Sequence, residues 1–122
     1  KKEGATSAIK TEDQIILDKL DGLIGREKVY QDPAIGRAEL ARELKVGEAT
    51  LSRLVNARYG KTIPQFLNEF RVKDAQRLLK ETDASIQNIF EESGFNSITT
   101  FNRVFKELSG DSPTEYRARF RL

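Results

Sequence analysis

The chain has 122 residues, a length that suits one domain or two small subdomains that share an element. Lys and Arg number 21 against 19 for Asp and Glu, so affinity for nucleic acid would depend on where the charges lie rather than on net charge. Neither Cys nor His occurs, which excludes disulfides and thiolate nucleophiles and removes the commonest metal ligand and general base. Composition therefore predicts a protein that is not an enzyme and needs no metal or cofactor.

The two ends of the sequence carry no targeting signal. No apolar run is long enough to span a bilayer and no signal-peptide pattern opens the chain, so we expect a cytoplasmic segment. Because Met is absent even at position 1, we expect a piece of a longer polypeptide whose N-terminal region holds a sensor or a dimerisation element. Residues 1–10 are small and polar, and are expected to be a disordered linker or an expression remnant.

The first half of the chain reads as three helices. Apolar residues recur at helical spacing after Thr11, and the pattern is interrupted at Pro33. Two shorter helices follow on either side of a turn at Gly47, and Gly60 is suited to end the second of them in a left-handed conformation. We therefore predict an N-terminal helix-turn-helix subdomain over residues 11–62.

Residues 63–81 are predicted to form one linker helix, because Pro64 suits a first helical turn and no breaker follows it. At 1.5 Å per residue this helix would be about 25 Å long, enough to set the distance between two subdomains. Beyond it, two short helices separated by Gly94 and a last helix that starts at Ser112 are expected. They predict a C-terminal helix-turn-helix subdomain over residues 82–122.

The strongest pattern in the chain is an internal repeat. Residues 37–60 (the first unit) and 86–110 (the second unit) each contain a short apolar-periodic helix, a tight turn and a second helix, with the second turn one residue longer. Arg53 and Arg103 stand at the same place in the two copies, each beside a buried apolar position. The repeat predicts an all-α fold with two helix-turn-helix subdomains joined by a long helix, and it indicates DNA binding.

In a helix-turn-helix the second helix enters the major groove, so its face opposite the buried residues is the candidate DNA-reading face. Arg can pair with guanine, Asn can pair with adenine, hydroxyls suit either, and an aliphatic side chain suits the thymine methyl. The candidates are Ala49, Thr50, Ser52, Arg53 and Asn56 in the first unit, and Ile98, Thr99, Asn102, Arg103 and Lys106 in the second.

Each candidate also has an ordinary structural explanation. A single Arg on a helix is usually solvated or ion-paired, but the repeated position of Arg53 and Arg103 favours base reading. Hydroxyl and amide side chains near helix starts are equally compatible with capping. Three basic residues suit phosphate contacts and are nearly as compatible with a solvated face: Arg58, Lys61 and Lys106. Four flanking acids would weaken indiscriminate phosphate binding: Glu48, Glu91, Glu92 and Glu107.

The stretch from about Gly36 to Phe120 resembles the C-terminal DNA-binding domain of the AraC/XylS transcription regulators of bacteria. The resemblance lies in ATLSRLVNARYG, which ends at Gly60, and in GFNSITTFNRVFK followed by SPTEYR. It implies seven helices, two helix-turn-helix subdomains joined by a long helix, and transcriptional control at promoters, usually activation. It also implies that seven residues stand at the family's base-contacting positions: Ala49, Ser52, Arg53, Ile98, Thr99, Asn102 and Arg103.

The sequence departs from the family pattern mainly in the first unit. Gly36 and Gly47 stand at capping positions where members often have Ser or Thr, and Ala49 stands where they often have a larger side chain. We therefore expect more direct base readout from the second unit. Residues 28–35, KVYQDPAI, resemble members whose N-terminal half is a membrane-embedded sensor, which implies a membrane-anchored parent with this domain in the cytoplasm.

The resulting hypothesis is sequence-specific binding of double-stranded promoter DNA by an AraC-type regulator, with two recognition helices in adjacent major-groove segments. The alternative is a helical protein-interaction module that docks a partner such as RNA polymerase. The Arg, Asn and Thr content of the candidate faces disfavours this alternative, because a docking surface would show more exposed aromatic side chains.

Overall fold

The computed structural model describes residues 11–121, and within them the chain forms seven α-helices, one short 3-10 helix and no strand. The elements are α1 (Thr11–Gly25), η2 (Val29–Gln31), α2 (Arg37–Leu44), α3 (Glu48–Tyr59), α4 (Ile63–Glu81), α5 (Ile86–Ser93), α6 (Ile98–Ser109) and α7 (Pro113–Phe120). The predicted all-α fold is confirmed. Residues 1–10, predicted to be a disordered linker, lie outside the described residues. No helix within residues 11–121 is both long and apolar enough to cross a bilayer.

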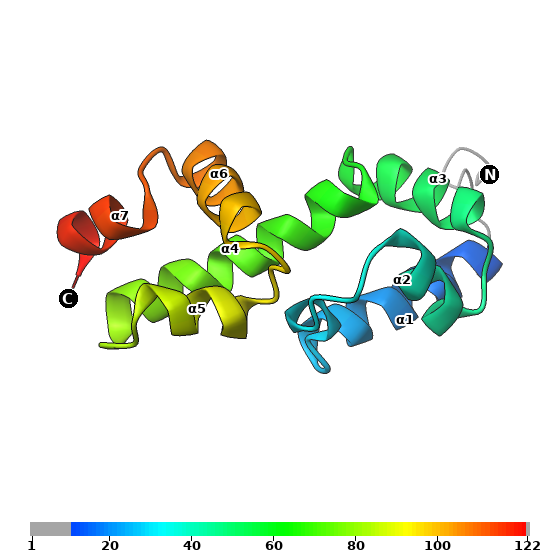
Figure 1. Ribbon diagram of the computed structural model, residues 1–122. Coiled ribbons are helices and arrows are strands. Elements are labelled where there is room, and N and C mark those ends of the chain that lie inside the picture. The colour runs from blue at the N-terminus through cyan, green and yellow to red at the C-terminus, as the bar shows by residue number, and fades with distance from the viewer. Residues whose placement is uncertain (1–10, 122) are drawn as a thin grey trace.

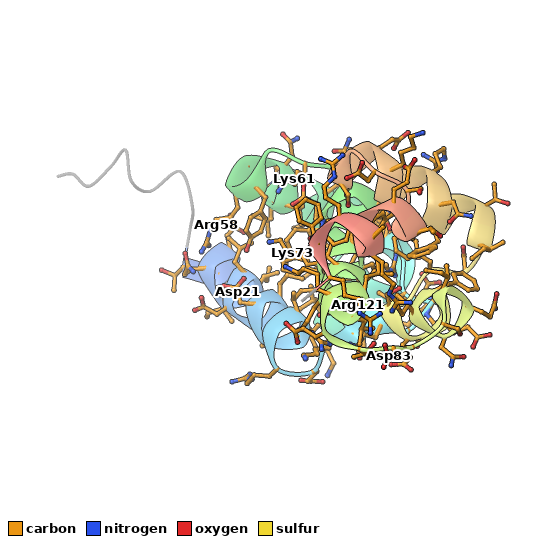
Figure 2. All side chains as sticks on the ribbon, turned by 90° about the vertical axis from the view of Figure 1, so that its left-hand side faces the viewer. Asp21, Arg58, Lys61, Lys73, Asp83 and Arg121 are labelled. Carbon is orange, nitrogen blue, oxygen red and sulfur yellow. The ribbon has the colours of Figure 1, made fainter. Side chains whose placement is uncertain are left out.

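The long helix α4 runs through the middle of the molecule. Its 19 residues correspond to about 28 Å at 1.5 Å per residue. In Figure 1 the helices α1 to α3 lie around its first half, and α5 to α7 lie around its second half. Figure 2, turned by 90°, shows α3 and α6 again on the upper side of the molecule, where Lys61 also lies, with α1 and α5 below. Both second helices of the repeat therefore lie on one side of α4.

Two separate hydrophobic cores lie along α4. The first contains Leu17, Leu20, Ile24, Tyr30, Leu40, Ala41, Leu44, Leu51, Leu54, Val55, Ile63, Phe66 and Leu67. The second contains Val72, Ala75, Leu79, Ile89, Phe95, Phe101, Val104, Phe105 and Tyr116. Each helix-turn-helix unit thus has its own core, and α4 supplies residues to both. The division into subdomains at residues 62 and 82 stays a prediction, because α4 belongs to both cores.

The second unit also touches η2, which precedes the first unit in the chain. Gly94, which ends α5 with a φ of 99°, leaves so little space that a Cβ would lie 2.1 Å from the carbonyl oxygen of Tyr30 and 2.8 Å from Cα of Gln31. Arg71 donates to the same carbonyl oxygen of Tyr30 from its Nε, at 2.7 Å. Its Nη2 donates to the carbonyl oxygen of Ile35, at 2.9 Å. A buried guanidinium therefore fixes the segment on which the second unit rests.

The helix ends follow the expected capping pattern, with one difference between the units. The backbone N–H three residues into the helix donates to the hydroxyl of Ser85 in α5, of Ser97 in α6 and of Ser112 in α7. Gly36 and Gly47 stand at the starts of α2 and α3 and offer no side-chain acceptor. At α2 the backbone N–H of Gly36 donates instead to Oε1 of Glu39 at 3.0 Å, so among these four helix starts only that of α3 has no side-chain cap.

Candidate nucleic-acid interface

The second helices of the two units, α3 and α6, are the predicted recognition helices, and each is fixed by three buried side chains. Leu51, Leu54 and Val55 anchor α3 in the first core, and Phe101, Val104 and Phe105 anchor α6 in the second. These residues recur at positions i, i+3 and i+4, so they define one stripe on each helix. The opposite face of each helix is therefore left toward solvent, on the side of α4 that the two helices share.

The structure brings the predicted DNA-reading residues together on these two solvent-facing surfaces. Thr50 and Ser52 are half-buried. The other candidates are exposed: Ala49, Arg53, Asn56, Ile98, Thr99, Asn102, Arg103 and Lys106. Ile98 is among the exposed large apolar side chains, at 39%. The chemistry that each surface offers is thus a guanidinium, an amide and hydroxyls, with an aliphatic group added in the second unit.

Each candidate arginine faces a carboxylate. Arg103 pairs with Glu107 one turn further along α6, at 3.4 Å between Nη1 and Oε1, and both side chains are 60% exposed. Arg53 pairs with Asp13 of α1, at 3.8 Å between Nη1 and Oδ2; its own side chain is 60% exposed and that of Asp13 only 12%. The two arginines therefore occupy equivalent places in the repeat but receive their counter-charge from different elements.

Sequence reasoning identified Glu107 as a flanking acid but missed Asp13. A signal was present, because Asp13 lies four residues before Leu17 and seven before Leu20, on the buried stripe of α1. A carboxylate on such a stripe requires a partner, since an unpaired buried charge is costly. The partner lies forty positions away in the sequence, so the stripe alone does not reveal which residue it is.

The remaining cations near the recognition helices are also interleaved with acids. Arg37 pairs with Glu48 at 3.3 Å, and Lys61 pairs with Glu69 at 2.7 Å. A groove of about 490 Å³ between the start of α4 and α6 is lined by both charges, including Lys61, Glu69, Arg103 and Glu107. A uniformly basic surface would attract any polyanion. The alternation of charge here leaves binding to depend on the positions of individual groups.

The base of α3 carries one further ordered contact. The hydroxyl of Tyr59 donates to Oδ1 of Asp21 at 2.8 Å, and the guanidinium of Arg58 lies 5.7 Å from the Tyr59 ring centroid. Burial, followed by this hydrogen bond, raises the pKa of Tyr59 above its usual value. The ring therefore stays neutral at physiological pH and supports Arg58 at the exposed end of the helix.

These features define a double helix-turn-helix domain, and comparison with known proteins agrees. A family model described as a helix-turn-helix domain matches residues 40–119. The chain is similar to the HTH-type transcriptional activator RhaR of Mannheimia succiniciproducens, at 31% identity over 83 residues, covering 68% of this chain and 30% of that protein. It is also similar in structure to the C-terminal domain of AraT, a response regulator from Geobacillus stearothermophilus, with a TM-score of 0.81 and 26% identity over 88% of this chain and 87% of that one.

A second solved structure resembles the chain closely as well. The DNA-binding domain of AdpA, a global transcriptional factor whose structure contains a target DNA, gives a TM-score of 0.75 and 26% identity over 86% of this chain and 91% of that one. The chain belongs to the family of AraC-type helix-turn-helix domains, as its motifs predicted, and it is a DNA-binding domain of transcription regulation. It spans about 30% of the length of RhaR.

Proposed function

We propose that this domain recognises a promoter operator sequence-specifically, with α3 and α6 in two successive major-groove segments on one side of the duplex. The observation that carries the proposal is the placement of Arg53 and Arg103 at equivalent exposed positions on two helices that lie on one side of α4. The DNA-bound domain of AdpA, which shares this fold, supports double-stranded DNA as the partner.

The chemistry of each exposed group suggests its part in recognition. Arg53 and Arg103 suit bidentate hydrogen bonds to guanine, and Asn102 suits the same arrangement with adenine. Ile98 suits contact with a thymine methyl group. The remaining reading positions are polar or small and adapt to either base pair: Ala49, Thr50, Ser52, Asn56 and Thr99. Three cations suit the phosphates that fix the register: Arg58, Lys61 and Lys106.

The rest of the protein follows from the family and from the composition. A bacterial regulator of this kind would act in the cytoplasm without enzymatic activity or a cofactor, carry a sensor or dimerisation region in another part of its chain, and contact RNA polymerase at the promoter.

The competing function is a protein-docking module that uses the same faces. It predicts no saturable binding to any duplex at low salt, whereas the DNA-reading proposal predicts binding that weakens as salt rises, because phosphate contacts release counterions.

The decisive experiment removes the two arginines separately. Operators are first selected from a random duplex pool, and Arg103→Ala and Arg53→Ala are then titrated against them. Each substitution should cost about 1 to 3 kcal/mol of specific binding and relax base preference at one position, and the two positions should differ. Arg77→Ala, which removes an exposed cation from α4 beside Tyr30, is the matched control and should leave base preference unchanged. Wild-type base preference in both folded variants would refute the assigned faces.

A further inference from the structure

We infer that Asp13 of α1 positions the guanidinium of Arg53 and thereby sets how selectively the first unit reads DNA. The inference rests on the proposed reading role of Arg53. It assigns a specificity-determining function to a helix that lies outside both helix-turn-helix units. Asp13 is not proposed to contact a DNA base. It acts by orienting the guanidinium of Arg53.

The geometry of the pair leaves Arg53 attracted but available. At 3.8 Å, Nη1 of Arg53 and Oδ2 of Asp13 are within ion-pair range but too far apart for a direct hydrogen bond. The guanidinium N–H groups on its exposed side therefore remain free to meet a base edge. The carboxylate is the more buried partner, because its side chain is 12% exposed while that of Arg53 is 60% exposed.

The position of Asp13 makes its carboxylate a fixed group. It lies in the first turn of α1, on the same stripe as the fully buried Leu17 and Leu20, so packing restricts its rotamers. A long, flexible Arg side chain that faces such a fixed anion loses orientational freedom before it meets DNA. Less entropy is then lost when it forms two hydrogen bonds to one base.

The same anion also reduces indiscriminate binding. A solvated guanidinium is attracted to any phosphate, and this attraction does not depend on sequence. Asp13 offsets part of that attraction, because its charge lies close to Arg53 and is partly removed from water. A guanine edge, which offers two acceptors in the plane of the guanidinium, competes with the carboxylate better than a passing phosphate does.

In the second unit, the corresponding ion pair joins Arg103 to Glu107, an exposed carboxylate, rather than to a buried one. Glu107 is one helical turn from Arg103, and both side chains are 60% exposed, so water and salt screen their attraction. Neither group is held by packing. Removal of Glu107 should therefore change DNA selectivity much less than removal of Asp13, although each change removes one negative charge.

The first experiment measures binding of the whole chain to the selected operator and to an unrelated duplex. In Asp13→Asn, affinity for the unrelated duplex at low salt should rise about threefold to tenfold, and base preference should weaken only at the position that Arg53→Ala identifies. Asp18→Asn is the matched control, since it removes the same charge from the same helix at an exposed residue that accepts from Gln14. Equal effects of the two variants would overturn the inference in favour of a general charge effect.

The second experiment separates a positioning role from a structural one by a double-mutant cycle. In the Arg53→Ala background, Asp13→Asn should leave base preference unchanged, whereas a structural role would alter it regardless of Arg53. Asp13→Glu, which keeps the charge, should hold affinity for the unrelated duplex within about twofold of the original. Circular dichroism checks folding, and Asp13→Ser replaces the Asn variant if the latter unfolds.

The two proposals fail in distinguishable ways. If Arg53→Ala relaxes base preference and neither Asp13→Asn nor Asp13→Ser does, the positioning role of Asp13 is wrong and the reading role of Arg53 stands. If Arg53→Ala itself leaves base preference unchanged, the reading role is wrong and the inference about Asp13 falls with it.

Discussion

The two helix-turn-helix units share one pattern but are stabilised by different contacts. In the second unit, the helices begin at Ser85 and Ser97, whose hydroxyls each accept a backbone hydrogen bond. In the first unit they begin at Gly36 and Gly47, which have no side chain to do so. A cap of this kind contributes about 1 kcal/mol relative to Ala. Both helix starts of the second unit thus have a hydroxyl cap, whereas in the first unit only α2 has a side-chain cap, from Glu39, and α3 has none.

The two cores differ in composition. Successive aromatic contacts in the second core run from Phe95 to Phe101, Phe105 and Tyr116, with ring centroids 5.3, 5.8 and 5.4 Å apart. The first core has aromatic contacts at Phe66, but most of its buried residues are leucines. Both cores are completed by elements that are not part of the repeat: α1, η2 and α4 in the first, and α4 and α7 in the second.

The contact between the second unit and η2 gives the largest expected effect. Gly94→Ala would place a methyl group 2.1 Å from the carbonyl oxygen of Tyr30 at a φ of 99°, so either the backbone at position 94 or η2 must move. The expected loss is about 3 to 5 kcal/mol of unfolding free energy, from strain and overpacking together. Urea denaturation measures it. Gly60→Ala is the control, because its φ is 69° but no atom lies within 4 Å, and about 1 to 2 kcal/mol is expected there. Equal losses would mean that the close contact of Gly94 with η2 adds nothing to the cost of a side chain at positive φ.

The buried arginine gives the next largest effect, and it tests the dependence of the first unit on its neighbours. Arg71 is 8% exposed and donates to carbonyl oxygens of Tyr30 and Ile35, and burial lowers its pKa. Arg71→Met would keep much of the apolar stem but leave these acceptors unpaired. The expected cost is about 3 kcal/mol, measured by urea denaturation.

The corresponding change beside the second core, at Arg117, provides the comparison. Arg117 of α7 is half-buried and donates to the carbonyl oxygens of Leu79 and Thr82, each at 3.1 Å, where α4 ends. Water can reach these acceptors, so Arg117→Met should cost about 1 kcal/mol. A cost for Arg117→Met equal to that for Arg71→Met would contradict the view that burial of the guanidinium makes Arg71 the more important of the two.

Much of this architecture could be predicted from local patterns. The linker helix was expected over residues 63–81 and spans Ile63–Glu81, since Pro64 and an unbroken apolar period specify it. The turns at Gly60 and Gly94 adopt the expected left-handed conformations. The 3-10 helix η2 was not predicted, because the segment around Pro33 reads only as a turn and the burial of Tyr30 depends on packing against distant residues.

The candidate site could be predicted less completely, for the same physical reason. A single helix's periodicity identifies which of its faces is solvent-exposed, and this sufficed to predict the exposed faces of α3 and α6. It does not show what approaches from another helix. Asp13 and Arg71 are both charged residues on buried stripes, beside Leu17 and Leu67 respectively. Each is satisfied by groups far away in the sequence, so its partner becomes known only from the fold.

A smaller effect on the unfolding free energy is expected at the start of α6, which is capped by Ser97. Ser97→Ala removes the hydroxyl that accepts a 3.1 Å hydrogen bond from the N–H of Thr100 at the start of α6. The expected loss is about 1 kcal/mol of unfolding free energy. Thermal or urea unfolding measures it. Ser97→Asn, which keeps an acceptor, should lose markedly less, and equal losses for the two variants would mean that packing rather than capping holds the helix start.

The smallest expected effect is a gain, at the equivalent position of the first unit. Gly47 has φ −71° and ψ 153°, an extended conformation that Ser adopts readily, and a Cβ there would meet no atom within 4 Å. Gly47→Ser can therefore add a hydroxyl acceptor without strain, and it should stabilise the chain by about 0.3 kcal/mol. Gly47→Ala fits the same space but lacks the acceptor, so it should not stabilise the chain. If Gly47→Ser and Gly47→Ala give the same unfolding free energy, a hydroxyl at position 47 adds no stability. The missing cap would then not explain how the first unit is stabilised, and packing of its leucine core would have to explain it instead.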